Sequence, residues 1–367
     1  MSDLYIGLMS GTSIDGADGV LAQFSGERLQ VIAHAHRSFD RTLRAELLAL
    51  NSPGDNELHR AALAANALVK VYAALVAELL EQAPGPVRAI GAHGQTVRHR
   101  PGQFDGVGYT LQLNAPSLLA ELTGIAVVAD LRSRDVAAGG QGAPLVPAFH
   151  HAHFGHRGED VAVVNIGGIS NLTLLPGGDE VVRGFDCGPG NALMDLWCLH
   201  HRGQAYDDKG SWAASGEVLP ALLAAARRDP YFALPPPKST GRDDFHAAWL
   251  ETLLDGFPNA PAQHVQATLC ELTVQVIAQD LQRHLPGAAE LLVCGGGALN
   301  LELMRRLQIA LPNTRVMSSA ARGLPPLQVE AAAFAWLARA HIEGRPGSLK
   351  EVTGAAGPRV LGAFYPA

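Results

Sequence analysis

The chain has 367 residues, of which 47% are hydrophobic and 17% are charged, and this composition excludes a disordered chain because it can bury large cores. Its length exceeds that of one ordinary domain, so we expect two domains. The formal net charge of −7, with lysines and arginines scattered along the chain, argues against a nucleic acid or an anionic membrane as partner.

Targeting and cysteine signals are weak. The first residues lack the cationic start and the apolar stretch of a signal peptide, and no run approaches the ~20 apolar residues of a membrane span. We therefore expect a cytoplasmic protein. Cys187, Cys198, Cys270 and Cys294 show no Cys-x-x-Cys spacing, so neither a zinc site nor a disulfide framework is predicted.

The N-terminal part predicts a three-stranded meander followed by helices and buried strands. The strands are expected at 4–10, 19–24 and 29–39. Apolar residues then recur at three- and four-residue spacing, which predicts a long helix. The expected order is a helix at 58–82, a buried strand at 87–96, a helix at 117–122 and a buried strand at 125–131.

The same order of elements begins again at residue 161. Strands are predicted at 161–168, 171–176 and 180–190, then helices from 191 and near 263–285, a strand at 290–297, a helix from 301 and a strand at 314–319. Two such sets predict an α/β fold of two duplicated ribonuclease-H-like (actin-like ATPase) lobes with an active-site cleft between them. We expect the first lobe at 1–135, joined by the segment 345–367, and the second lobe at 136–344.

Three glycine-rich turns follow predicted strands, at 7–16, at 167–168 and at 295–297. Glycine lets consecutive backbone N–H groups turn toward an anion, and a helix N-terminus adds partial positive charge. One such turn alone is more often an ordinary hairpin or strand–helix junction, but three together favour a polyphosphate site. Asp15 and Asp18 would repel phosphate unless a divalent cation lay between them, so magnesium is implied. The sequence contains no P-loop motif.

Eight motifs, in the same order, resemble the anhydro-N-acetylmuramic acid kinase family, within the superfamily of sugar kinases, actin and heat-shock ATPases. They are GLMSGTSIDGADG (7–19), AHGQTVRHRP (92–101), AAGGQGAPLVPAFH (137–150), NIGGISNLT (165–173), FDCGPGN (185–191), PPKSTGRDDF (236–245), CGGGALN (294–300) and VEAAAFAWLA (329–338). The match spans nearly the whole chain. One departure is Cys187, where the family has threonine.

The resemblance implies an ATP-dependent kinase of peptidoglycan recycling. In the family, water opens the 1,6-anhydro ring of anhydro-N-acetylmuramic acid, and O6 takes the γ-phosphoryl group, which gives N-acetylmuramic acid 6-phosphate. Asp186 matches the family's catalytic base, which would accept the proton of the water as the base of an inverting glycosidase does. From the residues alone, Asp186 is as readily a helix cap. The resemblance also suggests a homodimer.

The resemblance and the glycine turns together define the expected site residues. ATP is expected to contact Gly11, Thr12, Ser13, Ile14, Asp15, Gly16, Ala17, Asp18, Asn165, Gly167, Gly168, Gly295, Gly296 and Gly297. Magnesium is expected to bind through the phosphates, with Asp15 or Asp18 as candidate ligands. The sugar acid is expected to contact His93, Gln95, Arg132 and Glu330, because its lactyl carboxylate suits a guanidinium fork. For Arg134, binding of the sugar acid and a surface ion pair are equally expected.

Other signals and readings carry less weight. His150, His151, His153 and His156 lie close together, but no carboxylate or cysteine completes a metal set, so a polar helix end is expected. Residues 233–240 predict a stiff surface loop, with Lys238, Ser239 and Thr240 near the nucleotide or the substrate. Two alternative functions stay open: a conventional sugar kinase in which Asp186 deprotonates a free hydroxyl, and an actin- or chaperone-like ATPase.

Overall fold

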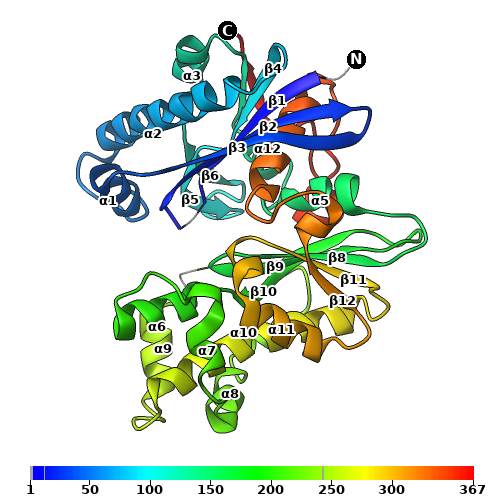
Figure 1. Cartoon of the computed structure of the whole chain (residues 1–367). Coiled ribbons are helices and arrows are strands. Elements are labelled where there is room, and N and C mark those ends of the chain that lie inside the picture. The colour runs from blue at the N-terminus through cyan, green and yellow to red at the C-terminus, as the bar shows by residue number, and fades with distance from the viewer. Residues whose placement is uncertain (1–2, 12, 242–243) are drawn as a thin grey trace. The chain divides into compact units, whose positions relative to one another are not determined.

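The computed structural model describes residues 3–11, 13–241 and 244–367. The chain divides into two compact units: unit 1 comprises Met1–His153 and Gln328–Ala367, and unit 2 comprises Phe154–Leu327 (Figure 1). The boundaries therefore differ from the expected 135 and 345. Helix α4 (Ser133–Ala137) crosses the first of these positions, and helix α12 (Val329–Ile342) belongs to unit 1 rather than to the second lobe.

In the described part of unit 1, six strands form one mixed sheet in the order β13-β7-β4-β1-β2-β3. The strands are β1 (Asp3–Met9), β2 (Gly16–Ser25), β3 (Arg28–Ser38), β4 (Val87–Ala92), β7 (Val127–Ala129) and β13 (Ala363–Tyr365). The first three form the predicted antiparallel meander, and β4 and β7 extend it in parallel. The C-terminal β13 pairs with β7 at the edge.

Helices cover both faces of this sheet, which explains why β1 is buried almost throughout. Alternate β1 residues, among them Ile6 and Leu8, share a core with Leu68, Tyr72 and Leu75 of helix α2. Helix α12 packs on the opposite face (Figure 1). The helices of unit 1 are α1 (Arg41–Ala49), α2 (Glu57–Leu80), α3 (Pro116–Thr123), α4, α5 (Val146–Phe154), α12 and α13 (Lys350–Thr353).

Helix α12 lies so close to β1 and β4 that its backbone touches theirs. A Cβ atom at Gly7 would lie 1.8 Å from the Ala331 carbonyl oxygen, and one at Gly91 would lie 2.0 Å from that of Phe334. Any side chain at these positions would push the helix away. Gly7 thus serves helix packing inside β1, which corrects its assignment to the first glycine turn.

Helix α2 corrects a second expectation, that no segment has the length and hydropathy of a membrane span. Among the described helices it alone passes that test. Its apolar side chains have a local explanation, because Leu68, Tyr72 and Leu75 are fully buried against the sheet. The helix is accounted for as the main core helix of unit 1.

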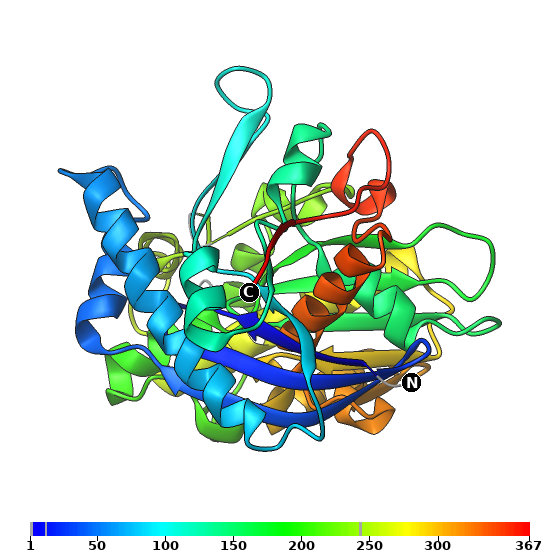
Figure 2. The ribbon, with the colours of Figure 1, turned by 90° about the horizontal axis from the view of Figure 1, so that it is seen from above.

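The strand predicted at 87–96 is in fact two elements. Strand β4 ends at Ala92, and Gly94, at a φ of 77°, turns the chain into β5 (Gln95–Pro101). Strand β5 pairs with β6 (Gly108–Leu113) in a separate hairpin that projects from the body of unit 1 (Figure 2). Phe104 and Tyr109 stack on its exposed surface with ring centroids 5.9 Å apart.

Unit 2 repeats the strand order of unit 1, which confirms the duplicated α/β fold. Its described strands form a sheet in the order β10-β9-β8-β11-β12, with β8, β9 and β10 antiparallel and β11 and β12 parallel. The strands are β8 (Val161–Ile166), β9 (Ile169–Leu175), β10 (Arg183–Pro189), β11 (Glu290–Cys294) and β12 (Arg315–Ser318).

The predicted helices of unit 2 are present, and several short ones were missed. The helical elements are α6 (Ala192–Arg202), η1 (Asp208–Gly210), α7 (Ser211–Ala214), α8 (Pro220–Ala226), η2 (Pro230–Ala233), α9 (Ala247–Leu254), α10 (Ala262–His284), η3 (Gly296–Leu299), α11 (Leu301–Ala310) and η4 (Ser319–Arg322). The helices α6 to α9 gather at one end of unit 2 (Figure 1).

The close contact between α12 and the sheet predicts that one added methyl group at Gly91 destabilises the fold. Gly91→Ala should lower the free energy of unfolding by about 1–3 kcal/mol, because the new methyl overlaps the helix backbone. Gly85→Ala is the matched control, since a Cβ at Gly85 meets nothing within 4 Å. Denaturant titration measures both variants, and equal midpoints for the two would contradict the packing argument.

Candidate functional site

The opening loop of unit 1 is anchored from beneath by buried polar contacts. Ser10, which is 1% exposed, lies 3.0 Å from the Tyr72 hydroxyl and donates to the Gly94 carbonyl oxygen at 3.0 Å. The Gln95 amide donates to the Gly11 carbonyl oxygen at 3.1 Å. Ser10 and Gly11 are therefore tied to α2 and to the start of β5.

Within this loop, the side chains divide between the core and the surface. Ile14, at a φ of 53°, is 3% exposed and belongs to the core of unit 1. Ser13 and Asp15 lie on the outside, where the Ser13 hydroxyl donates to the Asp15 carboxylate at 2.7 Å. Gly11 has open space around it, since a Cβ there would meet only Ser13 Oγ at 3.8 Å. Thr12 lies outside the described residues.

The next three expected nucleotide contacts, Gly16, Ala17 and Asp18, lie in β2 rather than in the loop. The Ala17 side chain is fully buried in the core. A Cβ at Gly16 would come within 2.6 Å of the Arg37 carbonyl oxygen, so packing accounts for this glycine. Asp18 Oδ1 lies 3.1 Å from ring nitrogens of both His34 and His36 on β3, so this carboxylate already has two polar contacts.

A second polar group of unit 1 forms around Arg132. Its Nε donates to His93 Nε2 at 3.1 Å, and its NH1 donates to the Gly142 carbonyl oxygen at 2.8 Å. Burial, and then the Arg132 charge, lower the pKa of His93 to about 3. The imidazole is therefore neutral and can accept from the guanidinium. Burial also lowers the pKa of Arg132 to about 10, which leaves it charged.

Glu330 joins this group because α12 packs on the sheet of unit 1. Burial raises the pKa of its carboxyl, the Arg132 charge lowers it by less, and Asp18 raises it. The expected substrate contacts His93, Gln95, Arg132 and Glu330 are thus all in unit 1, and the Gln95 side chain contacts the opening loop at Gly11. Sequence order had assigned Glu330 to the other lobe.

Arg134 does not join the group around Arg132. It lies on the exposed side of α4, and none of the described carboxylates pairs with it. Asp135 is engaged elsewhere, because it accepts from the Gly142 amide at 2.8 Å and from the Thr353 hydroxyl at 2.8 Å. No contact therefore supports either role of Arg134, as a ligand of the sugar acid or as a partner in a surface ion pair.

In unit 2, the two glycine turns lie against each other. The Gly167 carbonyl oxygen accepts from the Asn191 amide at 2.7 Å, which ties the β8–β9 turn to the start of α6. Strand β11 ends beside β8, with Cys294 opposite Asn165. A Cβ at Gly295 would lie 2.3 Å from Asn165 Oδ1, so the third turn passes directly over the first strand of the unit.

The glycines of these turns serve two different purposes. Gly295 and Gly297 are required by packing, because a Cβ at either would overlap Asn165 or Ile166. Gly167 and Gly296 have no neighbour closer than 3.8 Å and 3.5 Å to such an atom. The fold itself does not demand glycine at the latter positions, which leaves backbone that a ligand can approach closely.

Asn165 and Gly168 complete the expected contacts of these turns. The Gly168 carbonyl oxygen accepts from the Gly190 amide at 2.9 Å, so this residue braces the turn after β10. Asn165 is 9% exposed, and its Oδ1 has no hydrogen-bond partner among the described residues. A buried amide oxygen without a donor marks a place where a polar ligand group can add a contact.

Asp186 lies on β10, where its carboxylate is held by a loop that follows η2. Its Oδ2 accepts from the Ser239 hydroxyl at 3.0 Å and from the Thr240 amide at 3.0 Å. Helix α6 has no side-chain cap, so the helix-cap alternative for Asp186 is wrong. Burial raises the pKa of the Asp186 carboxyl, while Thr240, Ser239 and Lys238 each lower it by less.

The loop around Lys238 differs from the expected surface loop. Lys238 is 8% exposed as a residue, and its Nζ lies 2.9 Å from Asp280 Oδ2 of α10. Ser239 and Thr240 contact Asp186 rather than solvent alone.

Cys187 and His150 are not part of the candidate site. Cys187, the departure from the family pattern, is fully buried, and burial raises its pKa well above the usual thiol value. His150 was expected at a polar helix end but is fully buried, which lowers its pKa to about 3. No group of three metal-ligating side chains occurs in residues 3–11, 13–241 and 244–367.

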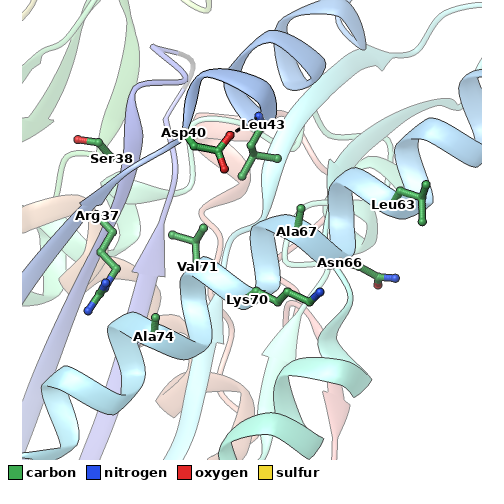
Figure 3. A pocket seen from close by; sticks show the side chains of 10 residues that line it. All are labelled: Arg37, Ser38, Asp40, Leu43, Leu63, Asn66, Ala67, Lys70, Val71 and Ala74. Atoms are coloured by element: carbon green, nitrogen blue, oxygen red, sulfur yellow. Dashed lines mark hydrogen bonds between the residues drawn. The ribbon is translucent and has the colours of Figure 1, made fainter.

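A groove of about 710 Å³ lies on another face of unit 1, between the β3–α1 junction and α2 (Figure 3). Arg37, Asp40 and Lys70 are its charged lining residues. Asp40 caps α1 by accepting from the Leu43 amide at 2.7 Å, as the dashed line in Figure 3 marks. None of the expected site residues lines this groove, so it belongs to neither polar group described above.

Known proteins resemble this chain over its full length. The model of the anhydro-N-acetylmuramic acid kinase family matches residues 3–367. The anhydro-N-acetylmuramic acid kinase of Variovorax paradoxus (strain S110) is 62% identical over 372 residues, which cover 100% of this chain and 99% of that protein. That of Albidiferax ferrireducens (strain ATCC BAA-621 / DSM 15236 / T118) is 60% identical over 389 residues and covers 100% of both chains.

The likeness to solved structures is looser. A ROK family glucokinase from Streptomyces griseus, solved in complex with glucose and AMPPNP, is 14% identical with a TM-score of 0.41, over 92% of this chain and 99% of that one. The family match and the two relatives above are far stronger. The chain therefore belongs to the anhydro-N-acetylmuramic acid kinase family.

Proposed function

We propose that the chain carries out its family's reaction with Asp186 as the general base. In this reaction a water oxygen attacks the anomeric carbon of anhydro-N-acetylmuramic acid, and the bond from that carbon to O6 breaks. O6 takes the γ-phosphoryl group of ATP, and ADP leaves. Asp186 accepts the proton that the water loses. The product is N-acetylmuramic acid 6-phosphate, an intermediate of peptidoglycan recycling.

The observation that carries this proposal is the environment of the Asp186 carboxylate. Two donors from Ser239 and Thr240 hold Oδ2, and none of the described residues donates to Oδ1. Burial raises the pKa of the carboxyl, which makes its ionised form a stronger base than an exposed aspartate. An oriented carboxylate of raised pKa is suited to general-base work near neutral pH.

ATP would be bound by backbone at the open glycines. Gly11 in unit 1 and Gly167 and Gly296 in unit 2 each leave room for close approach by a phosphate or an adenosine group. Ser13, which is half-buried, would add a further donor if its hydroxyl turned from Asp15 to the phosphate. These contacts position the phosphates, and phosphoryl transfer depends mainly on such positioning and on neutralising charge.

Magnesium fits this chemistry as an ion bound chiefly through the phosphates. The described residues offer no cluster of three ligands, and Mg²⁺ usually takes only one or two carboxylates together with substrate phosphates. Asp15 is the better candidate, because it is exposed in the loop whereas Asp18 Oδ1 is already shared by two histidines. When bound, the ion would neutralise phosphate charge.

The sugar acid would be bound by the polar group around Arg132. Three of the five guanidinium N–H donors are directed at His93 and Gly142, so two stay free for a carboxylate such as the lactyl group. His93 is neutral and keeps Arg132 in place without competing for the anion. Glu330 and Gln95 would contact the polar groups of the sugar.

We also infer that the enzyme is a cytoplasmic homodimer. The substrate is a small, charged sugar acid of cell-wall turnover, and ATP is a cytoplasmic compound, so the reaction needs both in one compartment. Family membership supports the dimer. Light scattering of the purified chain gives the mass of the assembly directly.

A side chain that fills the open space at Gly11 should weaken nucleotide binding and leave the stability of the fold unchanged. In Gly11→Val the nearest group to the new Cβ is Ser13 Oγ at 3.8 Å, so the melting temperature should change little. The affinity for a non-hydrolysable ATP analogue should fall about 10-fold or more, which is the loss of one hydrogen bond to a charged group. Calorimetric titration measures it, with Gly178→Val, at a turn open on all sides, as control. Unchanged affinity would mean that the loop binds something else.

Replacement of the proposed base should abolish turnover while nucleotide binding persists. Asp186→Asn is nearly isosteric but cannot take a proton, and loss of general-base assistance costs about 10²–10⁴-fold in rate. In ¹⁸O-labelled water the wild type should place the label on carbon 1 of the sugar and none in the phosphate. Label in the phosphate would indicate an ATPase, and an unlabelled phosphorylated sugar would indicate a conventional kinase.

The raised pKa of Asp186 predicts the acid side of the pH profile. Only the ionised carboxylate can accept the proton, so kcat/KM should fall as pH decreases through the pKa of Asp186. Because burial raises that pKa, the fall should be centred above 3.8, the ordinary value for aspartate. Steady-state rates across the acid range test this, and a limb centred below 3.8 would exclude Asp186 as the titrating group.

A further inference from the structure

A charged pair is buried behind the Asp186 carboxylate. Lys238 Nζ and Asp280 Oδ2 lie 2.9 Å apart, and the two side chains are only 2% and 4% exposed. Neither of these two atoms has a hydrogen bond of good geometry to any described residue, so the closest partner of each is the charge of the other. The Cys187 thiol is a further polar neighbour of the Asp280 carboxylate. The lysine stem passes the aromatic rings of Tyr231 and Phe185, with Nζ 5.2 Å and 5.7 Å from their centroids.

Such a pair is a poor means of stabilising a fold. Desolvation of two charges costs about as much as their attraction returns, and apolar replacements of similar volume are often equally stable. A buried lysine with a single carboxylate partner therefore calls for a reason other than stability. The position of Lys238 in the chain supplies one, since the residues that follow it directly are Ser239 and Thr240.

Three consecutive loop residues contact β10 around Asp186. The Lys238 carbonyl oxygen accepts from the Asp186 amide at 3.2 Å, and the next two residues donate to the Asp186 carboxylate. From the other side, the Tyr231 hydroxyl donates to the Asp186 carbonyl oxygen at 2.7 Å. The ion pair joins this loop to α10, the long helix of unit 2, so the loop cannot shift without separating two buried charges.

We propose that Lys238 is a positioning residue, whose ion pair with Asp280 fixes the loop that orients the Asp186 carboxylate. The inference rests on the proposed function, in which Asp186 is the general base. Lys238 acts through Asp186 in two ways. It fixes the two donors on Oδ2, and its positive charge favours the ionised carboxylate. Loss of either effect raises the pKa of the base and disturbs its orientation.

The charges around Asp186 allow the direction of the pH effect to be stated. Among the described residues, Lys238 is the cation whose charge lowers the pKa of Asp186, together with the donors Thr240 and Ser239. The other described titratable groups that face Asp186 or the ion pair are Cys187 on β10, Tyr231 on η2, Asp244 after the loop, and Asp280 and His284 on α10. Burial raises the pKa of both Cys187 and Tyr231, which keeps them neutral at the pH of the assay. Removal of Lys238 therefore moves the acid limb of kcat/KM upward.

The test uses two variants and a matched control. Lys238→Met keeps the apolar stem but leaves the Asp280 charge buried alone, so it can lose stability. Lys238→Met/Asp280→Leu removes both charges and should melt within a few degrees of the wild type. Lys350→Met removes a lysine that is 57% exposed and pairs only with its neighbour Glu351, and it serves as the control.

Both folded variants should lose kcat by about 10–10²-fold, in line with the cost of misplacing a catalytic group. The acid limb of kcat/KM should move up by about 1 pH unit, in accordance with the loss of a nearby opposite charge. Affinity for a non-hydrolysable ATP analogue should match that of the wild type and of Lys350→Met. If Lys238→Met does not fold, the double variant alone decides.

A purely structural role predicts the opposite pattern for the double variant. Restored stability together with wild-type kcat and an unmoved acid limb would overturn the inference, as would loss of ATP affinity in proportion to the loss of rate. Asp186→Asn, assayed alongside, separates this failure from failure of the proposed function. If Asp186→Asn retains turnover, the proposed base is wrong; if it is inactive while the Lys238 variants behave as wild type, only the positioning role is wrong.

Discussion

The backbone contact of α12 with β1 and β4 is the constraint on which the polar groups of unit 1 depend. Gly7 and Gly91 lack side chains, so the helix lies directly on the strands. The opening loop follows β1, His93 follows β4, and Glu330 lies in the first turn of α12. Because these three starting points are set by one rigid contact, the loop, the imidazole and the carboxylate keep a fixed relation. Larger residues at the two glycines would displace all three together.

Both units place a charged group in a buried setting and hold it with a partner of suitable protonation state. In unit 1, Arg132 donates to His93, which burial keeps neutral. In unit 2, Lys238 pairs with Asp280 beneath the loop that contacts Asp186. Electrostatic interactions are strong in such low-dielectric surroundings, and an unpaired charge there would be costly. The partners therefore do more than stabilise, because they restrict the geometry of Arg132 and of the loop that contacts Asp186.

Much of the fold could be predicted because its signals are local. Strand order, the two meanders and the long helices follow from periodicity and turn residues, and each appears in the structure near its predicted place. The errors involve contacts between distant segments. The sequence pattern predicts Gly94 inside a strand, whereas a Cβ there would overlap the Leu113 carbonyl oxygen of β6. The sequence pattern predicts Gly7 in a turn, whereas its neighbour is a helix more than 300 residues away in the sequence.

The amino-acid sequence by itself determined the family, the duplicated fold and the aspartate at the end of the repeated meander, since motifs and periodicity are properties of neighbouring residues. It could not determine on which sheet α12 packs, nor that Lys238 lies buried against Asp280, nor that Ser239 and Thr240 contact Asp186. Those facts depend on contacts between residues that lie from about 40 to more than 300 positions apart in the chain. Burial and charge neutralisation act through such contacts in space, so only the tertiary structure decided them.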